Sequence, residues 1–76
     1  MNNMIEQLAR DIIKSKDRHK IKAEIEWYLE GHYTKCRFIA ILISCNLYKE
    51  EYYELLEKLT DRNLLLKLYK LIKNEN

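Results

Sequence analysis

Residues 36–48 read Cys-Arg-Phe-Ile-Ala-Ile-Leu-Ile-Ser-Cys-Asn-Leu-Tyr, and this stretch decides the fold. Residues 38–43 form an unbroken apolar run, and no other part of the chain goes so long without a charge. In a helix these side chains point almost all the way round, which is typical of a buried central element rather than a surface helix. We therefore expect a helix over about residues 35–46, with the other helices packed around it.

The same run also permits a strand, because the β-branched side chains of Ile39, Ile41 and Ile43 favour extended backbone. The rest of the chain offers no partner strand, and an isolated strand leaves its backbone N–H and C=O groups unpaired. The chain has no proline and one glycine, Gly31, so the tight turns of β-hairpins are poorly supplied. Leu, Ile, Lys and Glu dominate, which favours an all-α protein.

Four further segments show helical periodicity, each with one apolar face. We expect these helices over about residues 3–14, 18–30, 48–59 and 62–73. Gly31 is the natural left-handed residue to end the second helix. Thr34 is placed to cap the helix that follows it, and Thr60 or Asp61 to cap the last helix.

The expected fold is an all-α, compact bundle of four to five short helices around the hydrophobic central helix at about 35–46. A length of 76 residues predicts a single helical domain over residues 1–76. A domain of this size has marginal stability unless it associates or is cross-linked. Association with a second copy of the chain is therefore one of the expectations.

The overall charge and the cysteines narrow the function classes. A net charge of +2 is too mild to imply nucleic-acid binding by itself, and it excludes an acidic mimic of DNA.

Cys36 and Cys45 lie in one expected helix, too far apart for an internal disulfide, so we expect free thiols and a cytoplasmic location. The N-terminus shows no signal-peptide pattern. The apolar run is shorter than the roughly 20 residues that cross a bilayer, so no membrane partner is expected.

Residues 10–22 are basic, with Asp11 and Asp17 as the only acidic side chains and His19 among the cations. Such a patch binds phosphates or acidic protein surfaces, but a lysine-rich helix face is also commonly just solvated. Nucleic-acid binding is therefore the alternative function, and it would use Arg10, Lys14, Lys16, Arg18 and Lys22. No aromatic side chains are interleaved with these cations, which argues against binding single strands by stacking.

Several large apolar side chains, most of them aromatic, lie off the main apolar faces of their helices. Trp27, Tyr53 and Leu66 do so clearly, and Tyr33 and Tyr69 lie near the borders. Tryptophan and tyrosine are enriched at the energetic centres of protein–protein interfaces. The other interpretation is that short helices pack irregularly and bury a second flank. We expect a protein-binding surface in which cations steer the partner and aromatic rings supply contact area: Arg18, Lys20, Lys22, Trp27, Tyr28, Tyr53 and Tyr69.

No catalytic residue, metal site or cofactor is expected. Carboxylates mix with lysines as they do on solvated helix faces, and no glycine-rich loop is present to bind a phosphate. His32 and Cys36 are the only closely spaced soft metal ligands, which is too few for a structural zinc site. Cys36 lies between Lys35 and Arg37 near a helix start, a position that favours a reactive thiol. No acid is placed to orient His32, however, so catalysis is not predicted.

We therefore expect a small non-enzymatic protein that binds another protein, as an adaptor or an inhibitor. The abundance of Lys, Asn, Ile and Tyr is typical of an AT-rich genome. Small size without catalytic motifs is typical of accessory proteins of phages and mobile elements. The expected partner is another protein or a second copy of the chain, and nucleic acid is the alternative partner.

Overall fold

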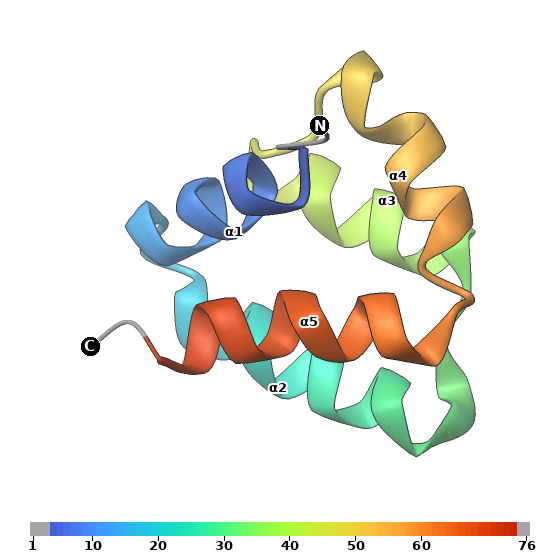
Figure 1. Cartoon of the computed structure of the whole chain (residues 1–76). Helices are drawn as coiled ribbons and strands as arrows, with labels where there is room; N and C mark the ends of the chain where they lie inside the picture. Colours follow the sequence, from blue (N-terminus) through green and yellow to red (C-terminus); the bar gives the residue numbers. More distant parts are fainter. Residues whose placement is uncertain (1–3, 75–76) are drawn as a thin grey trace.

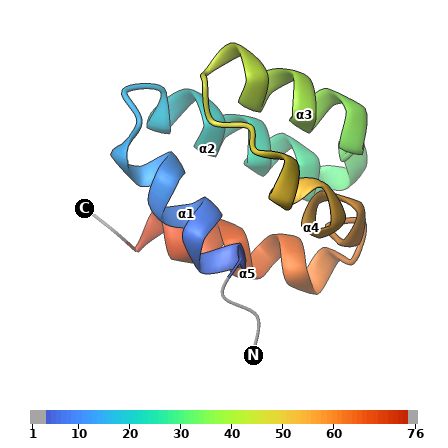
Figure 2. The same cartoon turned by 90° about the horizontal axis from the view of Figure 1, so that it is seen from above.

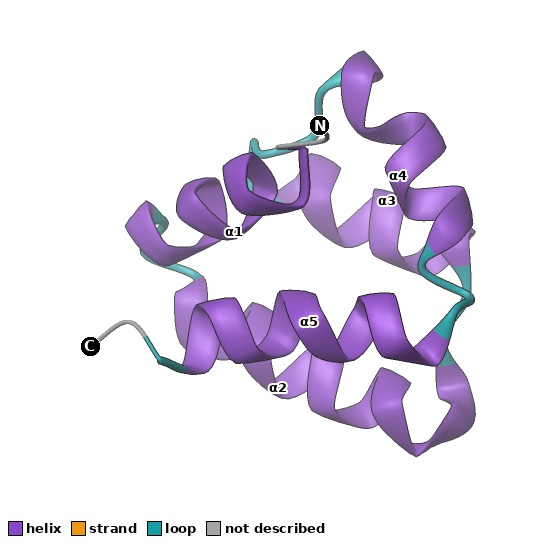
Figure 3. Cartoon of the chain, viewed as in Figure 1, coloured by secondary structure: helices purple, strands orange, loops and turns teal. Residues whose placement is uncertain are grey.

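The computed structural model describes residues 4–74, and this part of the chain is built from helices without strands (Figure 3). This confirms the predicted all-α bundle and excludes the strand interpretation of the apolar run. In chain order the elements are α1 (Met4–Lys14), α2 (Arg18–Trp27), the π-helical turn η1 (Tyr28–His32), α3 (Lys35–Ser44), the 3₁₀ turn η2 (Glu50–Tyr52), α4 (Tyr53–Lys58) and α5 (Arg62–Lys73).

The helices form a nearly isometric body with extents of 27 × 26 × 25 Å. α5 packs against both α1 and α2, and α3 packs against α4. In Figure 1, α1 and α5 lie nearer the viewer than the fainter α3, and Figure 2, seen from above, shows α3 on one side of the molecule and α1 and α5 on the opposite side. The bundle therefore has two distinct helical faces, one formed by α3 and one by α1 with α5.

The helix boundaries follow the local signals in the sequence. The Thr34 side chain accepts a hydrogen bond from the Arg37 backbone N–H at 3.3 Å, and Asp61 accepts one from the Asn63 N–H at 2.9 Å. These caps satisfy donors that the first turn of a helix leaves unpaired. Gly31 has φ of 109°, so the predicted left-handed residue after α2 is confirmed.

α3 ends in a similar way, although without a glycine. Asn46 has φ of 62°, a left-handed conformation that asparagine tolerates better than most residues. The Asn46 N–H donates to the Ile43 carbonyl at 3.0 Å, and the Leu47 N–H donates to the Leu42 carbonyl at 2.8 Å. This pair of hydrogen bonds is the Schellman arrangement, and it pairs carbonyls that the last turn would otherwise leave open.

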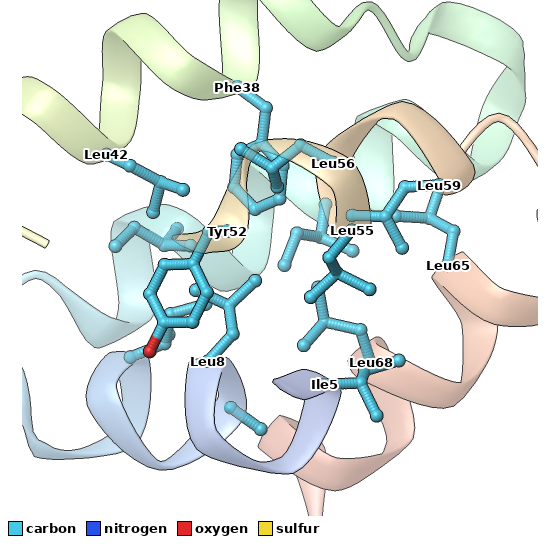
Figure 4. Packing of buried hydrophobic residues seen from close by; sticks show 14 of the residues in the cluster. Ile5, Leu8, Phe38, Leu42, Tyr52, Leu55, Leu56, Leu59, Leu65 and Leu68 are labelled. Carbon is cyan, nitrogen blue, oxygen red and sulfur yellow. The ribbon is translucent and has the colours of Figure 1, made fainter. Parts of the chain in front are cut away.

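All five α-helices contribute to one hydrophobic core (Figure 4). Each contributes apolar side chains at helical spacing, so every helix buries one stripe and exposes the other. The buried side chains are Ile5, Leu8, Ala9, Ile12, Ile21, Ile25, Tyr28, Phe38, Leu42, Tyr52, Leu55, Leu56, Leu59, Leu65, Leu68 and Ile72.

The position of α3 differs from the prediction of a buried central helix. Only Phe38 and Leu42 of α3 are buried, and Ile39 is half-buried. Ile43 keeps 57% of its surface exposed. The reason is geometric, because α3 lies at the edge of the bundle and packs mainly against α4, so only one face of it meets the core. Apolar side chains on every face of a helix allow the whole helix to be buried, but they do not determine which of its faces are buried.

Candidate protein-binding surface

Three large apolar side chains are exposed among residues 4–74, and they come from three different elements. Trp27 of α2 is 40% exposed, Ile43 of α3 is 57% exposed and Tyr53 of α4 is 41% exposed. Two cations of α3 join these elements: Arg37 lies 4.9 Å from the centre of the Trp27 ring, and Lys35 lies 4.3 Å from the centre of the Tyr53 ring. Trp27 and Tyr53 therefore flank α3 on its two sides.

The outward face of α3 lies between these two aromatic rings. Cys36, Ala40 and Ile43 are exposed and Ile39 is half-buried. Their spacing of i, i+3, i+4 and i+7 places them along one face of the helix. We refer to this face together with Trp27 and Tyr53 as the α3 platform. An uncharged strip bordered by aromatic rings is the kind of surface that marks interaction sites on soluble proteins.

The Trp27 edge of the platform is held by two contacts to the indole ring. The His32 imidazole stacks on the indole with ring centroids 4.6 Å apart and planes inclined by 11°. Arg37, over the same indole, pairs with the Glu24 carboxylate. The hydrogen bond from Arg37 lowers the pKa of Glu24 below its usual value. These contacts hold the indole in one orientation, and a side chain that is already ordered loses less entropy when it takes part in binding.

The Tyr53 edge is held in the same manner. Lys35 donates a hydrogen bond to the Tyr53 hydroxyl at 2.8 Å and another to Glu57 at 3.0 Å. These two hydrogen bonds, the one to Tyr53 first, raise the pKa of Lys35 above its ordinary value. Each edge thus consists of an aromatic ring, a cation from α3 and a carboxylate from the neighbouring helix. The result is an apolar strip with a polar rim, the usual arrangement of a protein interface.

Tyr28 is not part of this surface, so its prediction as a contact residue is wrong. It is only 2% exposed and packs edge-on against Tyr33 at 5.2 Å and Phe38 at 5.4 Å, measured between ring centres. Burial raises the pKa of Tyr28. Its place on the apolar stripe of α2, with Ile21 and Ile25, explains the burial. Tyr28 supports the platform from below instead of touching a partner.

Tyr69 and Lys22 lie together, but on the other flank of α2. The Tyr69 hydroxyl donates to the Glu26 carboxylate at 2.7 Å, and Lys22 lies 3.5 Å from the same carboxylate. The hydrogen bond lowers the pKa of Glu26 and raises that of Tyr69. These contacts join α2 to α5, whereas Trp27 on α2 faces α3. The predicted aromatic set is therefore divided between two sides of the molecule.

The basic stretch does not join the platform either. Lys20 is exposed and Arg18 is half-buried, and neither forms an ion pair within residues 4–74. Three further cations predicted to bind nucleic acid are also exposed and form no ion pair within these residues: Arg10, Lys14 and Lys16. The basic side chains lie in the second half of α1, in the turn after it and at the start of α2, whereas Tyr53 begins α4.

The exposure of Ile43 was not predicted from the sequence. The signal was present, because a helix that is apolar all round must expose one face when it lies at the edge of a small bundle. Cys36 is exposed on this face and Cys45 is half-buried, and both thiols are free. A reactive Cys36 stays a prediction.

Three further findings concern the rest of the site. Within the described residues, His, Cys, Asp and Glu side chains form no group of three that could hold a metal ion. Across the same residues, no helix is long and apolar enough to cross a bilayer. No protein-family model, curated protein or solved structure matches the chain.

Proposed function

We propose that the chain is a non-enzymatic protein that binds another protein on the α3 platform. The observation that carries the proposal is that Trp27, Ile43 and Tyr53, the large apolar side chains left exposed in residues 4–74, lie on α3 or against its two flanks. Leaving such a group in water is unfavourable by about 25 cal/mol per Å² of apolar surface, and a partner that covers it recovers that free energy.

The chemistry of the platform indicates what kind of partner surface fits. No charged residue occurs between Arg37 and Lys49, so the strip along α3 is matched by apolar side chains. Its rim consists of the Arg37–Glu24 and Lys35–Glu57 pairs, which suit polar groups at the partner's periphery. Trp27 and Tyr53 are the residue types that dominate binding energies, so we assign them the central energetic role.

Adaptors and inhibitors both act by docking without chemistry, and this chain fits that class. Origin in a phage or another mobile element remains part of the proposal and rests on composition and size alone. A second copy of the chain is the other occupant that the platform could accept. The oligomeric state of the purified protein separates these two occupants.

The proposal is tested by placing a photo-crosslinking amino acid at position 43 and, as a matched control, at position 58 on α4. Both positions are exposed and helical, but only position 43 belongs to the platform. We expect position 43 to form a crosslink to one defined protein in cells of the source organism. Trp27→Ala, combined with the crosslinking residue at position 43, should abolish capture of that protein. Ile43→Asp should abolish its co-purification with the chain that carries no crosslinking residue, while Lys58→Glu should do neither.

A crosslink between two copies of the chain, together with a dimer in sedimentation, would assign the platform to self-association. Crosslinking at position 58 with none at position 43 would contradict the proposal. Circular dichroism of each variant is needed, because a variant that has lost helix does not test the surface. Ile43→Asp replaces an exposed side chain, so we expect its helical signal to match that of the unchanged protein.

A further inference from the structure

A groove lies along α1 where this helix packs against α5. Figure 2 shows these two helices on the side of the molecule opposite α3. It has a volume of about 380 Å³ and is lined by Glu6, Ala9, Arg10, Ile13, Lys14 and Leu71. Ala9 and Ile13 from α1 meet Leu71 from α5, so the floor is apolar. Ile13 and Leu71 are half-buried, which leaves part of each side chain open to a ligand.

The edges of this groove are strongly cationic. Arg10 and Lys14 line it on the α1 side. Lys67 and Lys70 line an adjoining hollow on α5 that shares Leu71 with the groove. None of these four cations forms an ion pair within the described part of the chain.

Glu6 is the only acidic residue that lines either hollow. The cations therefore present positive charge that nothing within residues 4–74 neutralises by an ion pair. A ligand that supplies carboxylates along both edges of the groove would neutralise it.

We propose that the α1–α5 groove binds an acidic amphipathic helix of a partner protein. In this arrangement, apolar side chains at i, i+3 and i+7 of the partner helix contact Ile13 and Leu71. Carboxylates on its flanks lie beside Arg10 and Lys14 on one side and Lys67 and Lys70 on the other. The apolar contacts provide affinity and the charges provide orientation and rate of association.

The apolar floor favours a helix over nucleic acid as the occupant. A phosphate backbone binds through its contacts with cations, so its affinity does not require an apolar surface between those cations. A floor of Ala9, Ile13 and Leu71 contributes only to a ligand with apolar side chains. α1 has 11 residues, a length of about 16 Å, so the groove suits roughly three turns of a partner helix.

This groove and the α3 platform lie on opposite sides, so both surfaces can be occupied at once. A chain with two such surfaces joins two proteins, which is the action of an adaptor. The groove proposal does not depend on the platform, because the residues of the two surfaces are entirely different.

The test uses a fluorescent synthetic peptide of about 18 residues, with leucines on one helical face and glutamates on the flanks. A peptide of identical composition but scrambled order is the matched control. Fluorescence anisotropy should show at least about tenfold tighter binding of the ordered peptide, because only this peptide aligns its apolar side chains. Ile43→Asp should leave its affinity unchanged.

Variants of the protein complete the test. Lys14→Glu combined with Lys70→Glu should weaken peptide binding by about tenfold or more, while Lys58→Glu on α4 should have no effect. Ile13→Ala should also weaken binding. Lys14 and Lys70 lie in the last turns of α1 and α5, where positive charge also stabilises the helix. Unfolding free energies must therefore be measured for each variant beside the affinities.

Two results would overturn the proposal. One is equal binding of the ordered and the scrambled peptide, which would mean that charge alone is recognised. The other is tight binding of a DNA duplex that weakens steeply between about 50 and 200 mM salt and is insensitive to Ile13→Ala. That second result would assign the groove edges to a phosphate backbone.

Discussion

The Tyr52 hydroxyl donates a 2.5 Å hydrogen bond to the carboxylate of Asp11, which ties the start of α4 to the middle of α1 across 41 positions in the sequence. The Tyr52 ring is fully buried, and Lys49 lies 3.5 Å from the same carboxylate oxygen. A contact this distant in the chain fixes the packing of two helices that local sequence signals leave independent.

We expect Tyr52→Phe to lower the free energy of unfolding by about 1.5–3 kcal/mol, because the hydrogen bond has a charged acceptor. The ring still fills the core, so circular dichroism should show an unchanged helix content. Urea denaturation measures the difference. Tyr48→Phe is the matched control, since the Tyr48 hydroxyl makes no hydrogen bond within residues 4–74. Equal losses in both variants would contradict the assignment.

Gly31 yields a prediction about backbone conformation alone. Its φ of 109° disfavours any L-residue, and a Cβ placed there would have no atom within 4 Å. We therefore expect Gly31→Ala to lower the free energy of unfolding by about 1–2 kcal/mol without any steric clash. Chemical synthesis allows D-alanine at the same position. That variant should be at least as stable as the unchanged protein, because D-residues favour positive φ.

Alkaline pH should unfold the protein. Burial raises the pKa values of Tyr28, Tyr33 and Tyr52 above the ordinary value of 10.0. The unfolded chain ionises these tyrosines first, so stability is complete below about pH 10 and falls as the pH rises beyond it. Tyrosinate absorbance at 295 nm follows the ionisation of these three side chains, and circular dichroism follows the helix content. We expect the ionisation and the loss of helix to occur in one common transition. Ionisation of all tyrosines while the helices remain intact would contradict the prediction.

Acid should also destabilise the fold, and for the opposite reason. Hydrogen bonds from Arg37 and Tyr69 lower the pKa values of Glu24 and Glu26 from the ordinary value of 4.5. A carboxylate whose pKa is lowered by folding stabilises the fold at pH values above its unfolded-state pKa. This stabilisation is lost as the pH falls through the folded-state pKa. Glu24→Gln and Glu26→Gln should each flatten the decrease of the unfolding free energy between about pH 5 and pH 2. Arg37→Gln should remove the contribution of Glu24 in the same way.

Cys36 offers a chemical probe of the α3 platform. It is exposed, whereas Cys45 is half-buried, so we expect an alkylating reagent to modify Cys36 first in the folded protein. Mass spectrometry after short reaction times identifies the modified residue. A partner bound on the platform should protect Cys36. Rapid alkylation of Cys36 in the presence of a saturating partner would show that the partner binds elsewhere.

Much of the fold could be predicted because the signals are local. Thr34, Asp61 and Gly31 each act within a few residues of their own position, so the ends of α2, α3 and α5 follow directly from the sequence. The position of α3 could not be predicted in this way. Which face of an all-apolar helix is buried depends on how much of the core the other helices fill, and that is a property of the whole chain.

The candidate site could be predicted only in part. Trp27 and Tyr53 were identified as surface aromatics because they lie off the apolar stripes of their helices. Tyr28 was assigned to the surface on the basis of residue type, although its periodicity placed it on the buried stripe. Arg10 and Lys14 were recognised as cations, but their proximity to Lys67 and Lys70 arises from the packing of α1 against α5, which no local pattern reveals.

The nearly equal dimensions of the bundle, 27 × 26 × 25 Å, have a mechanical consequence. Buried side chains from all five α-helices meet in one core, so no flexible linker separates the face formed by α3 from the face formed by α1 and α5. Two molecules held on these faces would be kept at a set separation and also in a set mutual orientation. The body would then act as a rigid spacer rather than a tether.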